Sequence, residues 1–407
     1  MKVTKIETIR YSPQPNILWV RLHSEDGFIG LGETFYLPSA VEAVVHDTIA
    51  GFVIGQSAFN IERIWDEFFS YSNFFGFAGA EMRALSAIDI ALWDLIAQST
   101  GQPVYNLMGG RTRDQIPVYN TCVNGGPHLD YNGFMERPGQ LAKNLLAQGI
   151  KAMKIWPFDR FAPRFKNQVV IGPAGYPAMG PSGSHLSPRD LEAGLRTIVE
   201  IRDVVGSDMD IMIEGHCRWD LNCAIRIAKA LEPYDVRWIE DIIKPESVAD
   251  LARLVSETRV PQCVSERLFT RYAFREVLEA RAAHVIMPDL IWTGGITEGR
   301  KIAILADTYH LPIAPHDCTG LVALLANLHI CAVSTNAMIV ETVRGFYEGW
   351  YRDVYTENVQ IQDGAAAIPS ASGIGTSLKE EMLADAQTSI RVTTEVNRFP
   401  AAQANSR

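Results

Sequence analysis

Apolar and polar residues alternate with a period of two along the first 35 residues. The stretches VTKIETIRY, NILWVRLHS and FIGLGETF each have this alternation, and Glu-Asp-Gly at 25–27 supplies a turn between the last two. Residues 38–70 are expected to be helical. Residues 80–101 have apolar positions three and four apart and end at Gly101, which predicts a helix. Strands followed by helices predict an α+β unit.

From about residue 116 the pattern changes to short apolar runs that alternate with amphipathic helical stretches. The predicted strands are 116–122, 151–156, 210–216, 236–241, 261–266, 283–289, 311–317 and 337–342. Eight apolar strands joined by helices favour a closed parallel barrel, because parallel strands are covered on both faces. An open doubly wound sheet is the alternative, but no glycine-rich phosphate-binding motif follows the first of these strands.

The fold class that follows is α/β. We expect a modified (β/α)7β barrel over 116–358 and an α+β capping domain over 1–115. The segment 359–407, rich in alanine, glycine, serine and proline, is expected to pack back on the capping domain and then fray.

Composition narrows the class of protein. Hydrophobic residues make up 47% of the 407 residues and charged residues 21%, which is typical of a globular protein with a large core. The formal net charge of −10 argues against nucleic acid as a partner, because phosphate binding requires a basic surface. Six scattered cysteines, no signal peptide and no membrane-spanning run predict a soluble, cytoplasmic protein.

Ionisable residues end the predicted barrel strands. In a parallel barrel these ends converge on one mouth, where active sites lie. The residues are Lys154, Glu214, His216, Glu240, Asp241, Glu266, Asp289, His316, Asp317 and Glu341. A barrel built for stability alone does not need so many charged groups at one end, so we expect a functional site there.

Three glutamates end consecutive strands at equal intervals of 26 residues: Glu214, Glu240 and Glu266. Carboxylates that converge in a buried cup raise one another's pKa, and a hard divalent cation with oxygen ligands relieves that repulsion. The sequence therefore predicts an Mg²⁺ site. The alternative is that each glutamate caps a helix or forms a salt bridge.

Two histidines lie among these strand ends. His316 follows the seventh strand and Asp289 ends the sixth, so the carboxylate can orient the imidazole as a general base. His216 lies two residues beyond Glu214 and faces the same side of its strand. It is expected either to protonate a leaving group or to orient the metal site.

The remaining candidates surround these groups. Lys154, on the second strand, is placed to neutralise a substrate carboxylate, and Trp156 two residues later is expected to shape the pocket. Glu341, on the eighth strand, either donates a proton to an enolate oxygen or binds a lysine or arginine.

The motifs IMIEGH, WIED, VSER, IMPDLIWTGGITEGRKIA, APHDCTG and IVET cover the barrel. Together they resemble the mandelate racemase-like group of the enolase superfamily, and in particular its acid-sugar dehydratases. This superfamily uses a Lys or His base with Mg²⁺ that stabilises an ene-diolate. The resemblance implies one Mg²⁺ on the three glutamates, a His316–Asp289 dyad, and Glu341 beside the developing enolate.

The chain departs from that pattern at two positions. Glu214 stands where most relatives have aspartate, which shifts the cation slightly. Racemases of the group have Lys-x-Lys on the second strand, whereas this chain has Lys154-Ile155-Trp156 and lacks the second base. One base with a separate acid, His216, resembles galactonate-type dehydratases. These remove the proton next to the carboxylate, eliminate the β-hydroxyl and form a 2-keto-3-deoxy acid.

Two other functions remain open. An epimerase or cycloisomerase would use the same metal site without loss of water, and a catalytically silent homologue would bind metal only. Substrate specificity is expected from the capping residues, with Trp19 and Phe75 as contacts. It could also involve an insertion at 157–186 that contains Arg160, Arg164 and Lys166. The expected partner is a small carboxylate, and we expect a homo-oligomer.

Overall fold

The capping part of the chain is built on a four-stranded antiparallel sheet with the order β17-β1-β2-β3. The structure, a computed structural model, describes residues 1–162, 170–171, 176–177 and 183–395. The strands are β1 (Val3–Tyr11), β2 (Ile17–Ser24), β3 (Ile29–Phe35) and, from the far end of the chain, β17 (Thr388–Thr393). The helices are α1 (Pro38–Val44), α2 (Ala50–Val53), α3 (Ile61–Ser72), α4 (Ala80–Ser99) and α5 (Val104–Leu107), with a π-helical turn at Val45–Ile49. The predicted α+β unit is confirmed.

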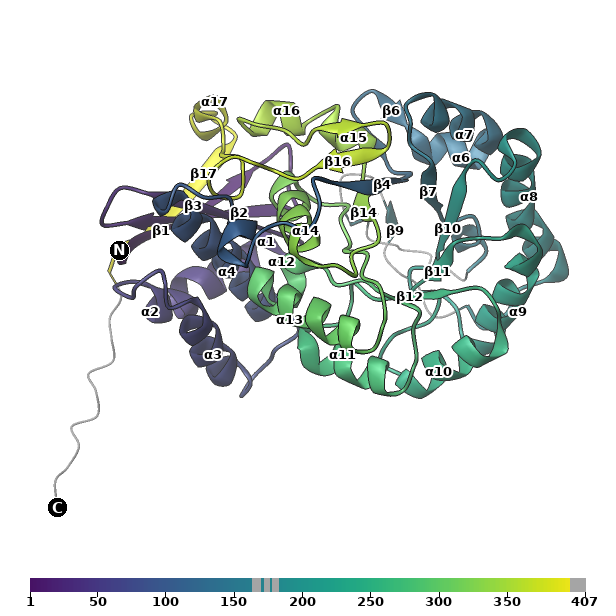
Figure 1. Ribbon diagram of the computed structural model, residues 1–407, viewed down its shortest axis with the longest axis horizontal. Helices are drawn as coiled ribbons and strands as arrows, with labels where there is room; N and C mark the ends of the chain where they lie inside the picture. The colour runs from purple at the N-terminus through teal and green to yellow at the C-terminus, as the bar shows by residue number, and fades with distance from the viewer. Residues whose placement is uncertain (163–169, 172–175, 178–182, 396–407) are drawn as a thin grey trace, which may run out of the picture.

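The second part is a ring of parallel strands with helices outside it (Figure 1). Its strands are β4 (Gln115–Thr121), β7 (Ala152–Ile155), β10 (Asp210–Glu214), β11 (Trp238–Glu240), β12 (Gln262–Val264), β13 (Val285–Ile286) and β14 (Val340–Thr342). Neighbouring strands pair in chain order, and β14 returns to pair with β4. The predicted barrel is therefore confirmed.

The outer helices alternate with these strands along the chain. They are α6 (Asp130–Glu136), α7 (Pro138–Ala147), α8 (Pro188–Val205), α9 (Leu221–Leu231), α10 (Val248–Glu257), α11 (Thr270–Glu279), α12 (Leu290–Thr293), α13 (Gly295–Thr308) and α14 (Leu321–Val333). Short helices α15 (Arg344–Tyr347) and α16 (Tyr351–Val354) follow β14. Two short antiparallel pairs lie elsewhere along the chain: β5 (Asn124–Gly125) with β6 (His128–Leu129), and β8 (Val170–Ile171) with β9 (Tyr176–Pro177). Across the described residues no helix is both long and apolar enough to cross a bilayer.

The seventh predicted strand, 311–317, is reduced to isolated parallel bridges at one residue. Ile313 bridges Ile286 on one side and Ala337 on the other, which closes the ring. Pro312 and Pro315 flank the bridge. Neither proline has an N–H to donate, which removes two donors from the ladder, although Ala314 and His316 still donate to the carbonyls of Ile286 and Pro288.

The C-terminal segment joins the two parts. Its elements are β15 (Ile361–Gln362), β16 (Ala365–Ala367), α17 (Glu380–Leu383) and β17. As expected, β17 pairs with β1 of the capping sheet. In addition, β16 pairs antiparallel with the start of β4, a contact with the barrel that the sequence did not predict. The tail at 396–407, expected to fray, lies outside the described residues.

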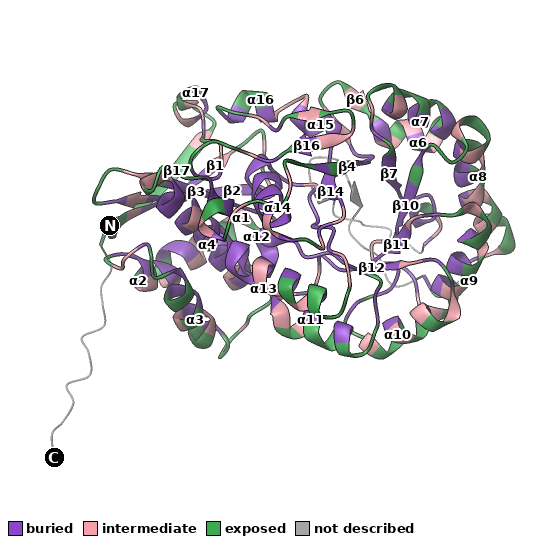
Figure 2. Cartoon of the chain, viewed as in Figure 1, coloured by how far each residue is buried: buried purple, intermediate pink, exposed green. Residues whose placement is uncertain are grey.

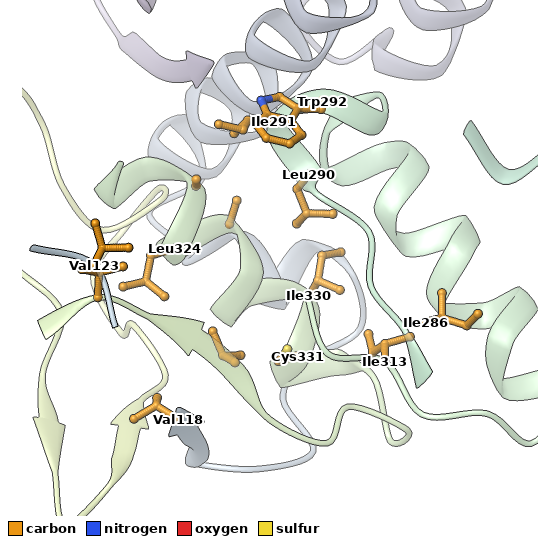
Figure 3. Close-up of a cluster of buried hydrophobic side chains, with 14 of the residues drawn as sticks. Val118, Val123, Ile286, Leu290, Ile291, Trp292, Ile313, Leu324, Ile330 and Cys331 are labelled. Atoms are coloured by element: carbon orange, nitrogen blue, oxygen red, sulfur yellow. The ribbon is translucent and has the colours of Figure 1, made fainter. Parts of the chain in front are cut away.

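Buried residues line the strands of the barrel and the inner faces of its helices, while exposed residues lie on the outside (Figure 2). A large cluster packs α14 against the sixth and seventh strand positions through Ile286, Ile313 and Ile330, and it extends to Trp292 on α12 (Figure 3). The cap rests on the same region, because the Trp65 indole donates a 2.9 Å hydrogen bond to the Gly294 carbonyl. The cap is thus fixed beside the strand ends that carry His316 and Asp289.

Candidate active site

Lys154 on β7 lies at the centre of a buried group of carboxylates. Its Nζ is 2.5 Å from an Oε of Glu240 and 2.8 Å from an Oε of Glu341. Glu214, the neighbour of Glu240 across the β10–β11 pair, is 3.6 Å away. All four side chains are at most 3% exposed. The parallel ladder therefore brings these four predicted residues together.

Burial and mutual repulsion dominate the electrostatics of this group. Burial and the charge of Glu214 raise the pKa of Glu240 well above its usual range, and burial raises the pKa of Glu214 to about 7. Burial opposes the charge on Lys154, but Glu240 and Glu341 together raise the pKa of its ammonium group. A single lysine cannot neutralise all the carboxylates, so Glu240 is protonated at neutral pH unless a further cation balances its charge.

Glu341 is ionised. Although burial acts against its charge, Lys154 and His316 lower its pKa to about 2. Its second oxygen accepts a 3.0 Å hydrogen bond from the Asp317 backbone N–H. Glu341 was expected either to donate a proton to an enolate oxygen or to bind a lysine or arginine. The structure shows an ion pair between Glu341 and Lys154.

Glu266 lies outside the ladder that aligns Glu214 with Glu240, although its charge acts on Glu214. The ladder pairs Glu240 with Cys263, so Glu266 lies three residues beyond its level and past the end of β12. It lies 3.5 Å from Arg267, and despite burial this charge lowers the pKa of Glu266 to about 2. The three glutamates are equally spaced in the sequence, but only Glu214 and Glu240 lie at the same level of the parallel strands.

Over the described residues, no three His, Cys, Asp or Glu side chains are gathered closely enough to hold a metal ion. The donor set nevertheless fits a hard divalent cation. One oxygen of Glu266 and one of Asp241 are buried without a hydrogen-bond partner, and the raised pKa values of Glu214 and Glu240 indicate that their ionised forms lack enough positive charge nearby. Oxygen ligands of this kind are those that Mg²⁺ prefers.

His316 and Asp289 form a dyad. The imidazole Nδ1 lies 2.7 Å from Asp289 Oδ2, and Nε2 lies 3.9 Å from Glu341 and 3.7 Å from the Cys318 sulfur. Asn327 on α14 donates a 2.9 Å hydrogen bond to the His316 carbonyl. Burial acts to lower the pKa of His316, but Glu341, Cys318 and Asp289 raise it well above its usual value.

His216 forms a second dyad, with a residue that the sequence analysis missed. Its Nδ1 lies 2.6 Å from Oδ2 of Asp159, in the turn that follows β7. Its backbone N–H donates a 2.6 Å hydrogen bond to Glu214, so the second imidazole is held beside a predicted metal ligand. The only signal for Asp159 was an acidic residue shortly after the end of a strand.

The predicted pocket residues have different outcomes. Trp156 packs against the His216 ring, with ring centres 5.5 Å apart. Trp19 is fully buried and its indole N–H donates to Glu33 and Tyr355, so a contact with substrate is wrong for this conformation. Phe75 is 62% exposed and packs its ring against Tyr71. The alternating pattern placed Trp19 in a strand. It did not indicate that Tyr355, from near the C-terminal end of the chain, contacts this side chain.

The cap supplies other residues instead. The Arg83 guanidinium on α4 lies 4.3 Å from the centre of the Trp292 ring, which is itself 5.3 Å from the His316 ring. Tyr36, directly after β3, packs on Trp292 at 5.8 Å. Arg83 and Tyr36 were not predicted as site residues, because each lies within or beside a stretch that was expected only to pack in the hydrophobic core. Of the insertion, Arg160 is exposed, and Arg164 and Lys166 lie outside the described residues.

Comparisons with known proteins agree with this arrangement. Residues 6–109 match the N-terminal domain of mandelate racemase/muconate lactonizing enzyme, and residues 139–382 match the enolase C-terminal domain-like family. The crystal structure of a mandelate racemase-subgroup enolase from Agrobacterium tumefaciens is 40% identical. Its TM-score is 0.86, with 97% of this chain and 99% of that chain covered.

Two further relatives have the name of dehydratase. A putative dehydratase from Zymomonas mobilis ZM4 is 26% identical with a TM-score of 0.84, covering 97% of this chain and all of that one. A D-galactonate dehydratase from Xanthomonas campestris pv. campestris is 31% identical over 390 residues, 94% of each chain.

A barrel with a cap and a mouth lined by carboxylates, a lysine and a His–Asp dyad defines an enzyme of the enolase type. The chain belongs to the mandelate racemase/muconate lactonizing enzyme group of the enolase superfamily. The predicted enzyme class, a carbon–oxygen lyase of the dehydratase type, is confirmed by the full-length relatives.

Proposed function

We propose that this enzyme dehydrates a sugar acid, an aldonate or an aldarate, with one Mg²⁺ held by Glu214, Glu240 and Glu266. The observation that supports this most is the presence of two separate His–Asp dyads, His316–Asp289 and His216–Asp159. Elimination of water requires a base for the α-proton and an acid for the β-hydroxyl, and two oriented imidazoles can fill these two roles.

His316 is the proposed base. Asp289 holds Nδ1, so Nε2 is the nitrogen that takes the proton from the carbon next to the carboxylate. The Glu341 carboxylate lies 3.9 Å from this nitrogen and pairs with Lys154, so both charges act on the imidazole from the same side. A bound divalent cation would supply positive charge that acidifies the α-proton and lowers the proton affinity of the nearby imidazole.

His216 is the proposed acid. Asp159 orients it through Nδ1, and the proton passes from Nε2 to the β-hydroxyl, which leaves as water. The carbon–hydrogen and carbon–oxygen bonds are both broken, and the electron pair of the first forms the enol double bond. Tautomerisation of the enol then gives a 2-keto-3-deoxy acid.

Dehydration is favoured over epimerisation by the residue at position 156. Trp156 occupies the place where a second lysine would act on the opposite face of the α-carbon, and an indole cannot accept that proton. It packs instead on His216 and helps to position the acid.

The test is direct turnover of a substrate library. The purified enzyme with Mg²⁺ is mixed with aldonic and aldaric acids, and the 2-keto acid product is measured. Turnover of at least one acid is expected, with loss on chelation and a decrease of about 10²–10⁴-fold in His316→Asn. Silence across the whole library, with metal binding demonstrated by calorimetry, would contradict the proposal.

A further inference from the structure

We propose that Arg83 and Trp292 bind a second anionic group of the substrate, and that the substrate class is therefore a sugar diacid. This inference rests on the proposed dehydration, and it narrows the choice between aldonate and aldarate. The first carboxylate would bind beside Lys154 and the predicted metal ligands, and the second at the interface between α4 and α12.

Arg83 forms no ion pair within 4 Å among the described residues, although Asp289, the partner of His316, and Glu81 act on its charge from farther away. Its Nη1 donates a 2.9 Å hydrogen bond to the Phe35 carbonyl, and its plane stacks over Trp292 at 4.3 Å and near Tyr36 at 5.9 Å. Burial lowers the pKa of Arg83 to about 10, so the side chain remains charged at neutral pH. A guanidinium has five N–H donors in a fork that matches a carboxylate.

Trp292 supplies an independent observation at the same place. Its side chain is 7% exposed, and its indole N–H has no hydrogen-bond acceptor in the described part of the protein. Buried donors are nearly always paired, so an unpaired N–H beside a guanidinium that forms no ion pair within 4 Å in the described residues indicates an absent acceptor. A carboxylate can accept from both groups.

The position of this pair relative to the base fits a substrate with two acidic ends. Lys154 contacts Glu341, Glu341 faces His316, and the His316 ring packs on Trp292. In this series of contacts the base lies between the anchor for the first carboxylate and Arg83. The hydrogen bond to Phe35 and the stacked rings would be enough for a purely structural role of Arg83. They leave the buried Trp292 N–H without an acceptor in the described residues.

The test compares matched pairs of substrates that differ only at the far end: galactarate with galactonate, glucarate with gluconate, and mannarate with mannonate. The ratio of kcat/KM for diacid over monoacid is measured in the wild type, in Arg83→Met and in Arg63→Met, an exposed arginine of α3. We expect the wild type to prefer one diacid. We expect Arg83→Met to lower the ratio by about 10²-fold, as for loss of a charged hydrogen-bonded pair, and Arg63→Met to leave it unchanged. A ratio that Arg83→Met leaves unchanged, or a wild-type preference for monoacids, overturns the inference and leaves the dehydration intact.

Binding is measured in parallel by calorimetry with Mg²⁺ in the His316→Asn background, where turnover is not needed. Tighter binding of a diacid than of its monoacid, lost when Arg83→Met is added, supports the inference even if no 2-keto acid forms with the active enzyme. That combination would contradict the proposed dehydration alone. Equal or undetectable affinity within every pair overturns the second anionic site.

Discussion

Each proposed catalytic histidine is oriented through the same ring atom. In both His316 and His216 a buried carboxylate contacts Nδ1, which fixes the ring and leaves Nε2 for proton transfer. Their surroundings differ, because Glu341 and Asp289 help to raise the pKa of His316, whereas His216 packs on Trp156. Two imidazoles of the same type can therefore have different tasks.

Asp159→Asn tests the second dyad. We expect kcat to fall by about 10²-fold, because the amide no longer holds His216 in the orientation needed to donate a proton. Steady-state turnover of the substrate found in the library measures this effect. Asp208→Asn, an exposed aspartate on the barrel surface, is the matched control. Equal activity of both variants would remove Asp159 from the mechanism.

Residues at strand ends were predictable from the sequence, whereas residues that approach the site from other elements were not. Lys154, Glu240 and Glu341 follow from the position of each strand, because a parallel ladder aligns its ends. Asp159 and Arg83 reach the site from a turn and from a cap helix, and one sequence contains no signal for such tertiary contacts.

The cap depends on close packing of β3 against α4. A Cβ at Gly32 would lie 1.9 Å from the carbonyl oxygen of Ala87, and one at Gly30 would lie 2.0 Å from that of Ala91. Only glycine permits this approach of strand to helix. Because α4 also carries Arg83, the packing sets where the cap meets the barrel.

Gly32→Ala should destabilise the protein. The added methyl group must push α4 away from β3, which is expected to cost about 1–3 kcal/mol of unfolding free energy, as for other overpacked sites. Gly51→Ala is the control, since a Cβ there meets nothing within 4 Å and glycine is unfavourable within a helix. Denaturant unfolding should give a lower midpoint for Gly32→Ala only, and equal midpoints would show that the cap relaxes freely.

The pattern of elements was more predictable than their lengths. Alternation located β1, β2 and β3 closely, although both faces of β2 and β3 are largely buried. The stretch 311–317 has the composition of a strand, but its bridges are limited to Ile313, and its two prolines remove two N–H donors from the ladder. The pairing of β16 with β4 could not be predicted from the local sequence pattern either, because it joins residues some 250 positions apart along the chain.

For the whole molecule, the buried carboxylates are a source of instability that a cation should remove. Burial raises the pKa of Glu214 to about 7, so the folded state binds this proton more tightly than the unfolded state. The contribution of Glu214 to stability is therefore complete below about pH 4.5 and is lost as the pH rises through 7. At higher pH the charges remain unless a cation balances them.

We therefore expect Mg²⁺ to raise the melting temperature, and to raise it more at pH 8 than at pH 5, where protons compete with the cation. At a concentration 100-fold above the dissociation constant the stabilisation is about 2.7 kcal/mol. Differential scanning fluorimetry at constant ionic strength, with EDTA reversal and with Glu240→Gln as control, measures this. A shift that is absent, or that Glu240→Gln retains in full, would contradict the metal assignment.

The central claim is that His316 removes the α-proton and His216 expels the β-hydroxyl. The most direct measurement follows the α-hydrogen by NMR while substrate is incubated in D2O with Mg²⁺ and the His216→Asn variant. The account predicts that recovered substrate gains deuterium at the α-carbon while 2-keto acid forms at least about 10²-fold more slowly than with the wild type, and that His316→Asn gives neither. Dehydration that persists without His216, or α-exchange that persists without His316, would contradict it.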